Sequence, residues 1–293
     1  MKVVVAGEIP TWKQNETGSV RPGATIRQWL FKEEAPDGLN FKAFRSQFQP
    51  GGAASTTPRH HHAFQQVRWA EAGPVNYAPG KNIPSGDLAY FPRGAYYGPQ
   101  LKDQGISIAL QLGFGNEHQH GPGWDSLQPE AMERLKARGS FENGVFVEID
   151  SDTGERREND SVQAVYEEQF AIQTGKKFVV PQEGYDEPIL VHTAAFEYYE
   201  TAPGVEVKHL GSFFDHAGPN GDLRLSMLRL SAGAAYTFGP ARGQVAWTRD
   251  AGLVIDGRTY PELTYVYIPR DEQVEVSSAT TVELNVAEFP RLD

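Results

Sequence analysis

The sequence predicts an all-β protein built from two domains. Three observations support this prediction: a length of 293 residues, the frequent glycines and prolines (30 and 20), and the short apolar segments between them. A typical domain has about 100 to 200 residues, so this length predicts two domains. Short segments rich in Val, Ile, Tyr, Phe and Thr, separated by turn residues, are typical of β-barrels and β-sandwiches.

Eight segments fit the strand pattern clearly. Turn signals such as Pro50-Gly51-Gly52 and Asp256-Gly257 separate them at spacings that suit hairpins. The expected strands are 41–48, 64–69, 88–91, 106–112, 223–230, 253–255, 264–268 and 280–286.

The middle of the chain has helical rather than strand periodicity. Residues 126–138 form an expected short amphipathic helix that Gly139 ends, and a second helix is expected at 161–173 with Asp160 as its N-cap. The charged stretch 150–160 is expected to be a surface loop.

These elements divide the chain into three parts. A first barrel is expected at 1–115, a helical and extended connection at 116–205, and a second barrel at 206–293. The first part contains the residues with the clearest capacity for chemistry.

Composition excludes several classes of partner and site. The formal net charge of -11 repels phosphate and anionic lipid, so we expect neither nucleic acid nor a membrane as a partner. No apolar run is long enough to span a bilayer, and residues 3–7 are too short for a signal peptide, so we expect a cytoplasmic protein. Without cysteine, any metal must be held by His, carboxylate, amide or phenol groups.

Three consecutive histidines stand at the start of an expected strand. On a strand alternate side chains share a face, so His60, His62, Phe64 and Gln66 are expected to point together and His61 the other way. Two imidazoles one residue apart on a strand can reach a single metal ion. The alternative is a hydrogen-bonded histidine cluster without an ion.

At these residues the chain resembles the cupin superfamily. The first cupin motif is His-x-His, a Glu about four residues on and then a Gly; the second is Gly, five residues, Pro-x-Gly, two residues and His. The matching residues are His60, His62, Gln66 and Gly73 for the first motif and Gly86, Pro92, Gly94 and Tyr97 for the second. The resemblance covers about residues 52–100.

This resemblance implies two cupin (jelly-roll) barrels in tandem and a divalent metal ion such as Fe, Mn, Ni or Zn. The chain departs from the motifs at Gln66 and Tyr97, where the family has Glu and His. Amide and phenol groups are weaker ligands than carboxylate and imidazole. A two-histidine, one-carboxylate iron centre would therefore need a carboxylate from elsewhere, such as Glu71 or Glu117.

Other residues have candidate roles in the same barrel. Gln66 and Tyr97 either bind the metal or hydrogen-bond each other or a substrate across the cavity. Phe64, Tyr90 and Gln111 are candidates for lining a substrate pocket, although a solvent-facing Gln111 is equally compatible with the pattern. His118 and His120 repeat the His-x-His spacing, but the glycines around them favour a loop.

The second barrel resembles a cupin in layout only. No histidine follows His216, and Tyr236 and Phe238 occupy the places where a His-x-His pair would stand. With Gln244 as a further interior position, this barrel is expected to be metal-free.

The leading hypothesis is a metal-dependent enzyme that acts on a small organic substrate, as a dioxygenase or as an isomerase. The alternative is a noncatalytic bicupin that binds a sugar or small acid, and a storage-type structural role is a third option. Because cupins commonly bury a sheet edge or face against a partner, a homodimer is expected.

Overall fold

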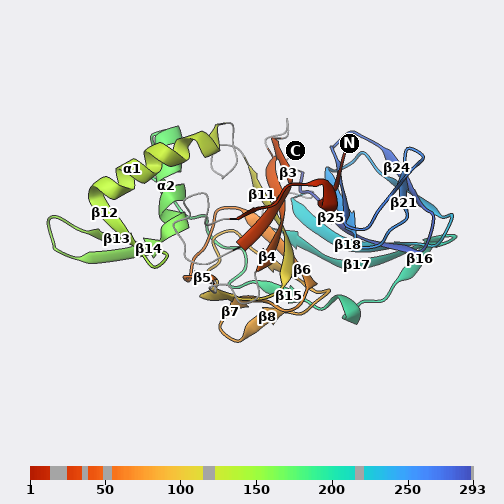
Figure 1. The fold of residues 1–293 in the computed structure, drawn as a ribbon, viewed down its shortest axis with the longest axis horizontal. Helices are drawn as coiled ribbons and strands as arrows, with labels where there is room; N and C mark the ends of the chain where they lie inside the picture. Colours follow the sequence, from red (N-terminus) through yellow and green to blue (C-terminus); the bar gives the residue numbers. More distant parts are fainter. Residues whose placement is uncertain (14–24, 35–38, 49–54, 115–122, 215–220, 292–293) are drawn as a thin grey trace. The chain divides into compact units, whose positions relative to one another are not determined.

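Antiparallel β-strands dominate the computed structural model, which describes residues 1–13, 25–34, 39–48, 55–114, 123–214 and 221–291 (Figure 1). The chain forms two compact units. We call Thr11–Val191 the first barrel, and Met1–Pro10 with His192–Asp293 the second barrel. Only two α-helices occur in the described ranges, which confirms the predicted all-β class.

A seven-stranded sheet forms the main wall of the first barrel. Its strands, in spatial order, are β15 (Ile189–Val191), β9 (Leu88–Phe91), β6 (Gln65–Ala72), β11 (Ile106–Phe114), β4 (Leu39–Phe48), β3 (Thr25–Glu34) and β2 (Trp12–Lys13). Two strand pairs complete the unit: β5 (Ser55–Thr57) with β10 (Gln100–Lys102), and β7 (Val75–Ala78) with β8 (Lys81–Ile83). All four strands predicted in this half are present, with ends shifted by at most three residues.

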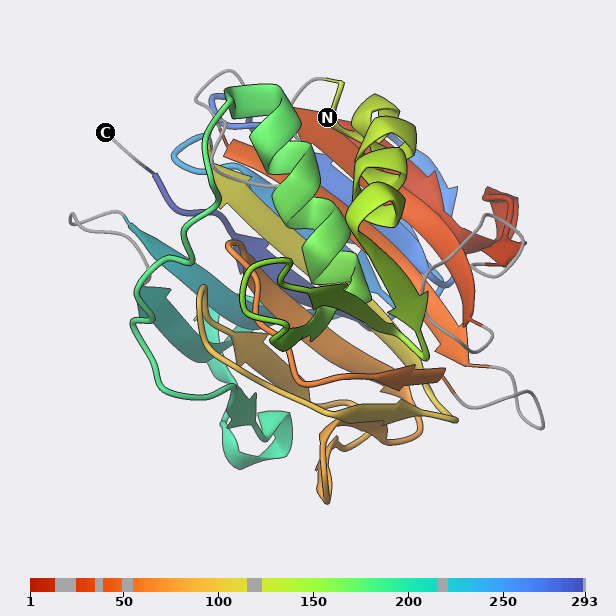
Figure 2. The ribbon, with the colours of Figure 1, turned by 90° about the vertical axis from the view of Figure 1, so that its left-hand side faces the viewer.

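The first barrel also carries both helices. The turn η4 (Trp124–Leu127) leads into α1 (Gln128–Arg138), and α2 (Ser161–Thr174) lies beside α1 in front of the strands (Figure 2). The Asp160 side chain caps α2 by accepting from the backbone N–H groups of Val162 and Gln163 at 3.1 and 2.9 Å. Both predicted helices are therefore confirmed.

The prediction of a loop at 150–160 was wrong in its second half. Arg156–Asp160 is strand β14, which pairs with β13 (Val145–Ile149), and β13 pairs with β12 (Gly139–Glu142). Its side chains are charged and mostly exposed, so they give no apolar alternation. Backbone hydrogen bonds to β13 hold the strand without burying its side chains.

The second barrel is built from two sheets. The seven-stranded sheet runs in the order β1 (Lys2–Val5), β23 (Thr264–Ile268), β20 (Gln244–Thr248), β25 (Val282–Glu288), β18 (Asp222–Leu230), β17 (Val205–Phe214) and β16 (Tyr199–Ala202). The four-stranded sheet runs in the order β19 (Ala235–Phe238), β24 (Val274–Ser278), β21 (Leu253–Ile255) and β22 (Arg258–Tyr260). Alternate residues of these strands point inward.

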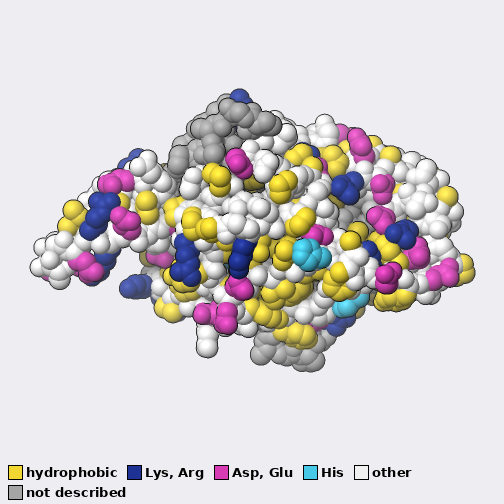
Figure 3. All heavy atoms as spheres, turned by 90° about the horizontal axis from the view of Figure 1, so that it is seen from below, with side chains coloured by type: hydrophobic (Ala, Val, Ile, Leu, Met, Phe, Trp, Pro, Cys, Tyr) yellow, Lys and Arg dark blue, Asp and Glu magenta, His cyan; other side chains and the backbone are white. Residues whose placement is uncertain are grey.

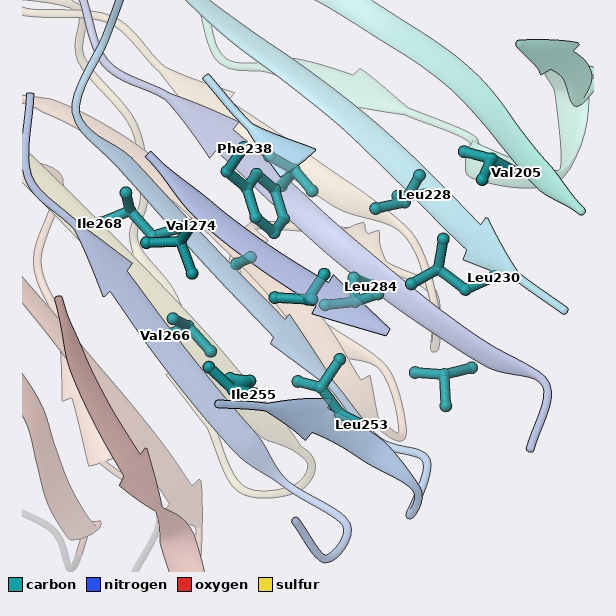
Figure 4. Packing of buried hydrophobic residues seen from close by; sticks show 14 residues of the cluster. Val205, Leu228, Leu230, Phe238, Leu253, Ile255, Val266, Ile268, Val274 and Leu284 are labelled. Atoms are coloured by element: carbon teal, nitrogen blue, oxygen red, sulfur yellow. The ribbon is translucent and has the colours of Figure 1, made fainter. Parts of the chain in front are cut away.

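These inward side chains form an apolar core in the second barrel. Phe238, Val266 and Leu284 are at most 1% exposed and lie among other aliphatic side chains of the two sheets (Figure 4). Tyr236 packs against Phe238 with ring centroids 5.0 Å apart. The Gln244 amide Nε2 donates to the Gly239 carbonyl at 3.0 Å.

The compact units divide the chain differently from the predicted boundaries. Strand β1 pairs with β23, so residues 1–10 belong to the second barrel although we placed them in the first. The helices and β15 belong to the first barrel rather than to a separate connection. Neither helix in the described ranges has the length and apolarity needed to cross a bilayer.

Candidate functional site

The first barrel encloses a cavity of about 630 Å³. Inward residues of β3, β4, β6 and β11 form its walls, and side chains of α2 and η4 cover it. Tyr166 of α2 packs on Trp124 with ring centroids 5.2 Å apart, and the Gln169 amide Nε2 donates to the Trp124 carbonyl at 2.8 Å. The helical segment thus closes one side of the cavity.

Residues from three neighbouring strands form a polar row across this cavity. Gln111 on β11 is paired in register with Lys42 on β4 and with Gln66 on β6. Directly paired residues of adjacent strands point to the same face of a sheet, and all three side chains line the cavity. The Gln111 amide Nε2 donates to Gln66 Oε1 at 2.8 Å. We refer to Lys42, Gln111 and Gln66 as the polar row.

The histidine segment precedes β6 instead of lying within it. His60 and Tyr97 exchange two backbone hydrogen bonds of 3.0 Å, and the Gly94 N–H donates to the His62 carbonyl at 2.8 Å. Gly94 has a φ of 77° and abuts the Pro181 backbone, so no side chain fits there. The motif glycine therefore lets the backbone at Pro181 pass close to the second motif.

The orientation of the three histidines agrees with only part of the strand argument. The rings of His60 and His62 contact Tyr97, with centroids 4.3 and 5.5 Å apart, whereas His61 packs on Tyr96 at 4.1 Å. Yet all three imidazoles border the cavity. The regular strand begins only at Gln65, so strict alternation does not govern residues 61–64.

Backbone carbonyls determine which nitrogen of each imidazole carries hydrogen. Nδ1 of His60 lies 2.8 Å from the Pro58 carbonyl oxygen, and Nδ1 of His62 lies 2.6 Å from that of Phe64. A carbonyl only accepts, so both Nδ1 atoms are donors and both neutral rings carry their lone pair on Nε2. Metal-binding histidines are commonly oriented by such a hydrogen bond from the other ring nitrogen.

His62 is the imidazole best prepared for a ligand. It is 5% exposed and stacks on Phe64, with the ring planes 5° apart. Its Nε2 is buried and finds no hydrogen-bond partner within the part of the chain that the structure describes. Burial lowers the pKa of His62 to about 3, so the ring is neutral at physiological pH. A buried lone pair without a donor calls for a metal ion or a bound molecule.

Gln66 presents its amide nitrogen to the cavity. Its oxygen accepts from Gln111, and its buried Nε2 has no hydrogen-bond partner among the described residues. To bind a metal, Gln66 would have to use the second lone pair of that same oxygen. The hydrogen-bond partner of Gln66 is Gln111 rather than Tyr97.

Of the two carboxylates that we considered for a metal centre, the structure describes only Glu71. Glu71 accepts two hydrogen bonds from Arg45, at 2.6 and 2.7 Å, and does not line the cavity, because it lies on the opposite face of β6. Glu117 lies outside the described residues, as do His118 and His120. Within the described ranges no three His, Cys, Asp or Glu side chains are grouped to hold a metal.

The structure places most of the predicted pocket residues at the cavity, but not all of them. Phe64, Gln111 and Tyr97 line the cavity, and Tyr97 also packs against Phe91 at 4.6 Å. Tyr90 does not line it, and that prediction was wrong. Its side chain is fully buried and its hydroxyl donates to Gln65 Oε1 at 3.3 Å, because alternation on β9 turns it away.

Sequence reasoning missed the cationic and aromatic residues of β3 and β4. Arg27 and Trp29 alternate along β3, and Lys42 and Phe44 along β4, and all four line the cavity. The available signal was Lys42 between Phe41 and Phe44 in an expected strand, since a lysine is rarely buried without a partner.

Lys42 lies in unusually dry surroundings for a lysine. It is 8% exposed, and burial lowers its pKa to about 8, although the Asp125 carboxylate 3.6 Å from Nζ acts in the opposite direction. Asp125 also contacts Lys32, so its charge is shared between two lysines. Lys42 remains largely protonated at neutral pH.

The comparisons with known proteins concern the fold. No protein-family model matches the sequence, and a search of the curated proteins finds no match. A "putative dioxygenase" from Nostoc punctiforme PCC 73102 superposes with a TM-score of 0.59 at 9% identity, covering 99% of this chain and 83% of that chain. A variant of oxalate decarboxylase OxdC from Bacillus subtilis gives 0.53 at 13% identity, covering 100% and 78%.

This chain has the bicupin fold. The bicupin architecture that the two sequence motifs implied is thereby confirmed. Another matching structure of the Bacillus subtilis oxalate decarboxylase, with a TM-score of 0.52 at 14% identity and coverage of 100% and 78%, was determined in work on the Mn(II) centres of that enzyme. At these identities the likeness extends to the bicupin fold and not to the chemistry.

Proposed function

We propose that this bicupin is a metal-dependent enzyme that acts on a small organic substrate in the cavity of the first barrel. The observation that carries the proposal is the buried Nε2 of His62, whose lone pair has no donor among the described residues while Nδ1 is held by the Phe64 carbonyl. His60 has the same Nδ1 arrangement and borders the same cavity. These two imidazoles are the residues that would hold a divalent ion.

A divalent ion bound there would supply a Lewis acid and, if redox-active, a site for dioxygen chemistry. The chain itself supplies orientation. Gln66 offers a buried N–H donor to a substrate oxygen, and Tyr97 borders the imidazoles. The side chains of α2 and η4 would cover one side of a bound substrate.

Two of the matched bicupins support an oxidoreductase or lyase type of chemistry. One is described as a "putative dioxygenase" and another is an oxalate decarboxylase with Mn(II) centres. Because no group of three His, Cys, Asp or Glu side chains in the described residues could hold a metal, an ion bound by His60 and His62 would keep positions for substrate. If the purified protein contained no metal ion, the alternative of a noncatalytic binding protein would be favoured.

Metal analysis tests the proposal directly. The full chain is produced with Fe, Mn, Ni and Zn supplied and is purified without chelator or a histidine tag, beside the double variant His60→Ala/His62→Ala. We expect about one divalent ion per chain in the parent and almost none in the variant. A metal-free parent, or a variant with the same metal content, would overturn the proposal.

A further inference from the structure

We propose that the cavity of the first barrel binds an organic carboxylate with a flat apolar body, with the carboxylate at Lys42 and the apolar body against Trp29 and Phe44. This inference deepens the proposed function by naming a substrate class for the same cavity, and it rests on that proposed site.

The charges that line the cavity favour an anion. Among the described lining residues, Arg27, Lys42 and Arg68 are cationic, and Asp125 and Asp160 are the carboxylates. Asp160 is committed to the N-terminus of α2 and Asp125 also contacts Lys32. The lining thus carries three cations and two carboxylates in a chain with a net charge of -11. The face shown in Figure 3, by comparison, has acidic and basic side chains interspersed. Low-dielectric walls increase the attraction of such a cavity for anions.

Lys42 is the cation placed for direct contact. It is fixed in a strand and belongs to the polar row, so its ammonium group faces the same cavity as the Gln66 amide. Gln66 lies two strands away, roughly 10 Å at the usual strand spacing. A buried ammonium whose nearby carboxylate is shared with another lysine gains by meeting a second carboxylate, because charge-assisted hydrogen bonds are strong in dry surroundings.

The aromatic pair lies one row from Lys42. Trp29 and Phe44 are paired in register across β3 and β4, with ring centroids 5.3 Å apart at an interplanar angle of 65°. Phe44 is two residues from Lys42 on the same strand, roughly 7 Å along it. Trp29 is 37% exposed, and Lys42 Nζ lies 5.8 Å from its ring centroid. A ligand with a carboxylate next to a ring is long enough to reach from Lys42 to these two aromatic side chains.

Benzoate and benzamide are the matched probes, because they share a ring and differ in charge. Binding to the full chain as purified is measured by isothermal titration calorimetry. We expect benzoate to bind at least tenfold more tightly than benzamide, since only benzoate supplies a charge for Lys42. This comparison needs no variant. Equal binding of the two probes would overturn the inference.

Two lysine variants separate cavity charge from general charge. Both lysines contact Asp125, but only Lys42 lines the cavity, while Lys32 does not. We expect Lys42→Met to weaken benzoate binding at least tenfold, and Lys32→Met, which leaves Asp125 to Lys42 alone, to weaken it by a clearly smaller factor. Lys42→Arg, which keeps the charge, should retain binding. Unchanged benzoate affinity in a folded Lys42→Met protein would contradict the inference.

The same titration on His60→Ala/His62→Ala distinguishes this inference from the metal site. If that variant lacks metal but binds benzoate in a manner that depends on Lys42, the carboxylate subsite stands by itself. If the parent binds metal but not benzoate, the carboxylate inference fails and the proposed metal site does not.

Discussion

The two barrels share a strand architecture but differ in what their inward residues do. In the second barrel Leu228, Val266 and Leu284 pack into a continuous apolar core. In the first barrel the corresponding inward rows carry Lys42, Gln66 and other polar groups around an open cavity. Alternation on a strand determines which residues face inward, whereas the type of residue decides between a core and a site.

The two barrels also differ in how the polar groups around their hollows are paired. A hollow of about 470 Å³ lies among its residues and includes Asp222, Arg224 and His209. Asp222 is bound by Arg224 at 2.7 Å and by Arg242 at 2.6 Å, so these charges satisfy one another. In the first barrel, by contrast, the amide of Gln66 and the imidazole of His62 keep buried polar atoms for which the described residues offer no partner. The proposed site therefore differs from this hollow in that its buried polar atoms include some without a partner among the described residues.

The contrast predicts that interior substitutions destabilise the second barrel more than the first. Leu284→Ala should destabilise the second barrel by about 2–5 kcal/mol, because it leaves a cavity in a closed core. Gln66→Leu should cost only about 1 kcal/mol, because it removes the hydrogen bond from Gln111 but also removes a buried Nε2 that has no partner among the described residues. Urea unfolding of both variants beside the parent checks this. Equal costs at the two positions would remove the distinction between core and site.

Single histidine variants sharpen the assignment of the ligands. His60→Ala and His62→Ala should each weaken Mn²⁺ binding roughly a hundredfold or more, because each removes one of two imidazole ligands. His61→Ala should change it less than about threefold, because its ring packs on Tyr96 instead of Tyr97. Calorimetric titration with Mn²⁺ measures all three. If His61→Ala lost binding as fully as the others, His61 would be a ligand.

Glu71 provides a test of a charge that belongs to the wall and not to the site. Glu71→Gln should lower stability by roughly 1–3 kcal/mol, since its carboxylate accepts two hydrogen bonds from Arg45 in partly buried surroundings. Its metal content should equal that of the parent. A variant that lost metal but kept its stability would indicate that Glu71 is a metal ligand.

The smallest expected effect concerns pH and Lys42. Because burial lowers its folded-state pKa to about 8 from 10.5, the unfolded chain binds more protons between these values, and stability rises with pH there. Relative to Lys42→Met, the parent should gain roughly 1 kcal/mol between pH 7 and pH 9. Asp125, Lys32 and Arg27 are the charges that act on this lysine. Urea unfolding at the two pH values measures the difference, and a parent that lost stability relative to the variant would contradict a lowered pKa.

Local sequence patterns predicted both helices and eight of the 25 strands that the described residues form. Apolar alternation and turn residues placed the eight expected strands, and the Asp160 cap and Gly139 placed the helices. The spacing of two motifs implied the bicupin fold, which the solved structures confirm. The other strands were missed; in β3 and β14, for example, mixed polar and charged side chains hide the period.

By itself the sequence determined the all-β class, and the resemblance of its two motifs to the cupin superfamily implied the bicupin fold, because both depend on residue spacing along one strand or turn. Only the tertiary structure decided that Lys42, Gln111 and Gln66 share a row, that Glu71 is bound to Arg45, and that Tyr90 turns away from the cavity. These facts depend on register between strands that are 24 to 69 residues apart in the chain, as for Gln66 and Lys42 or Gln111 and Lys42. Backbone pairing sets that register, and no pattern within a single segment records it.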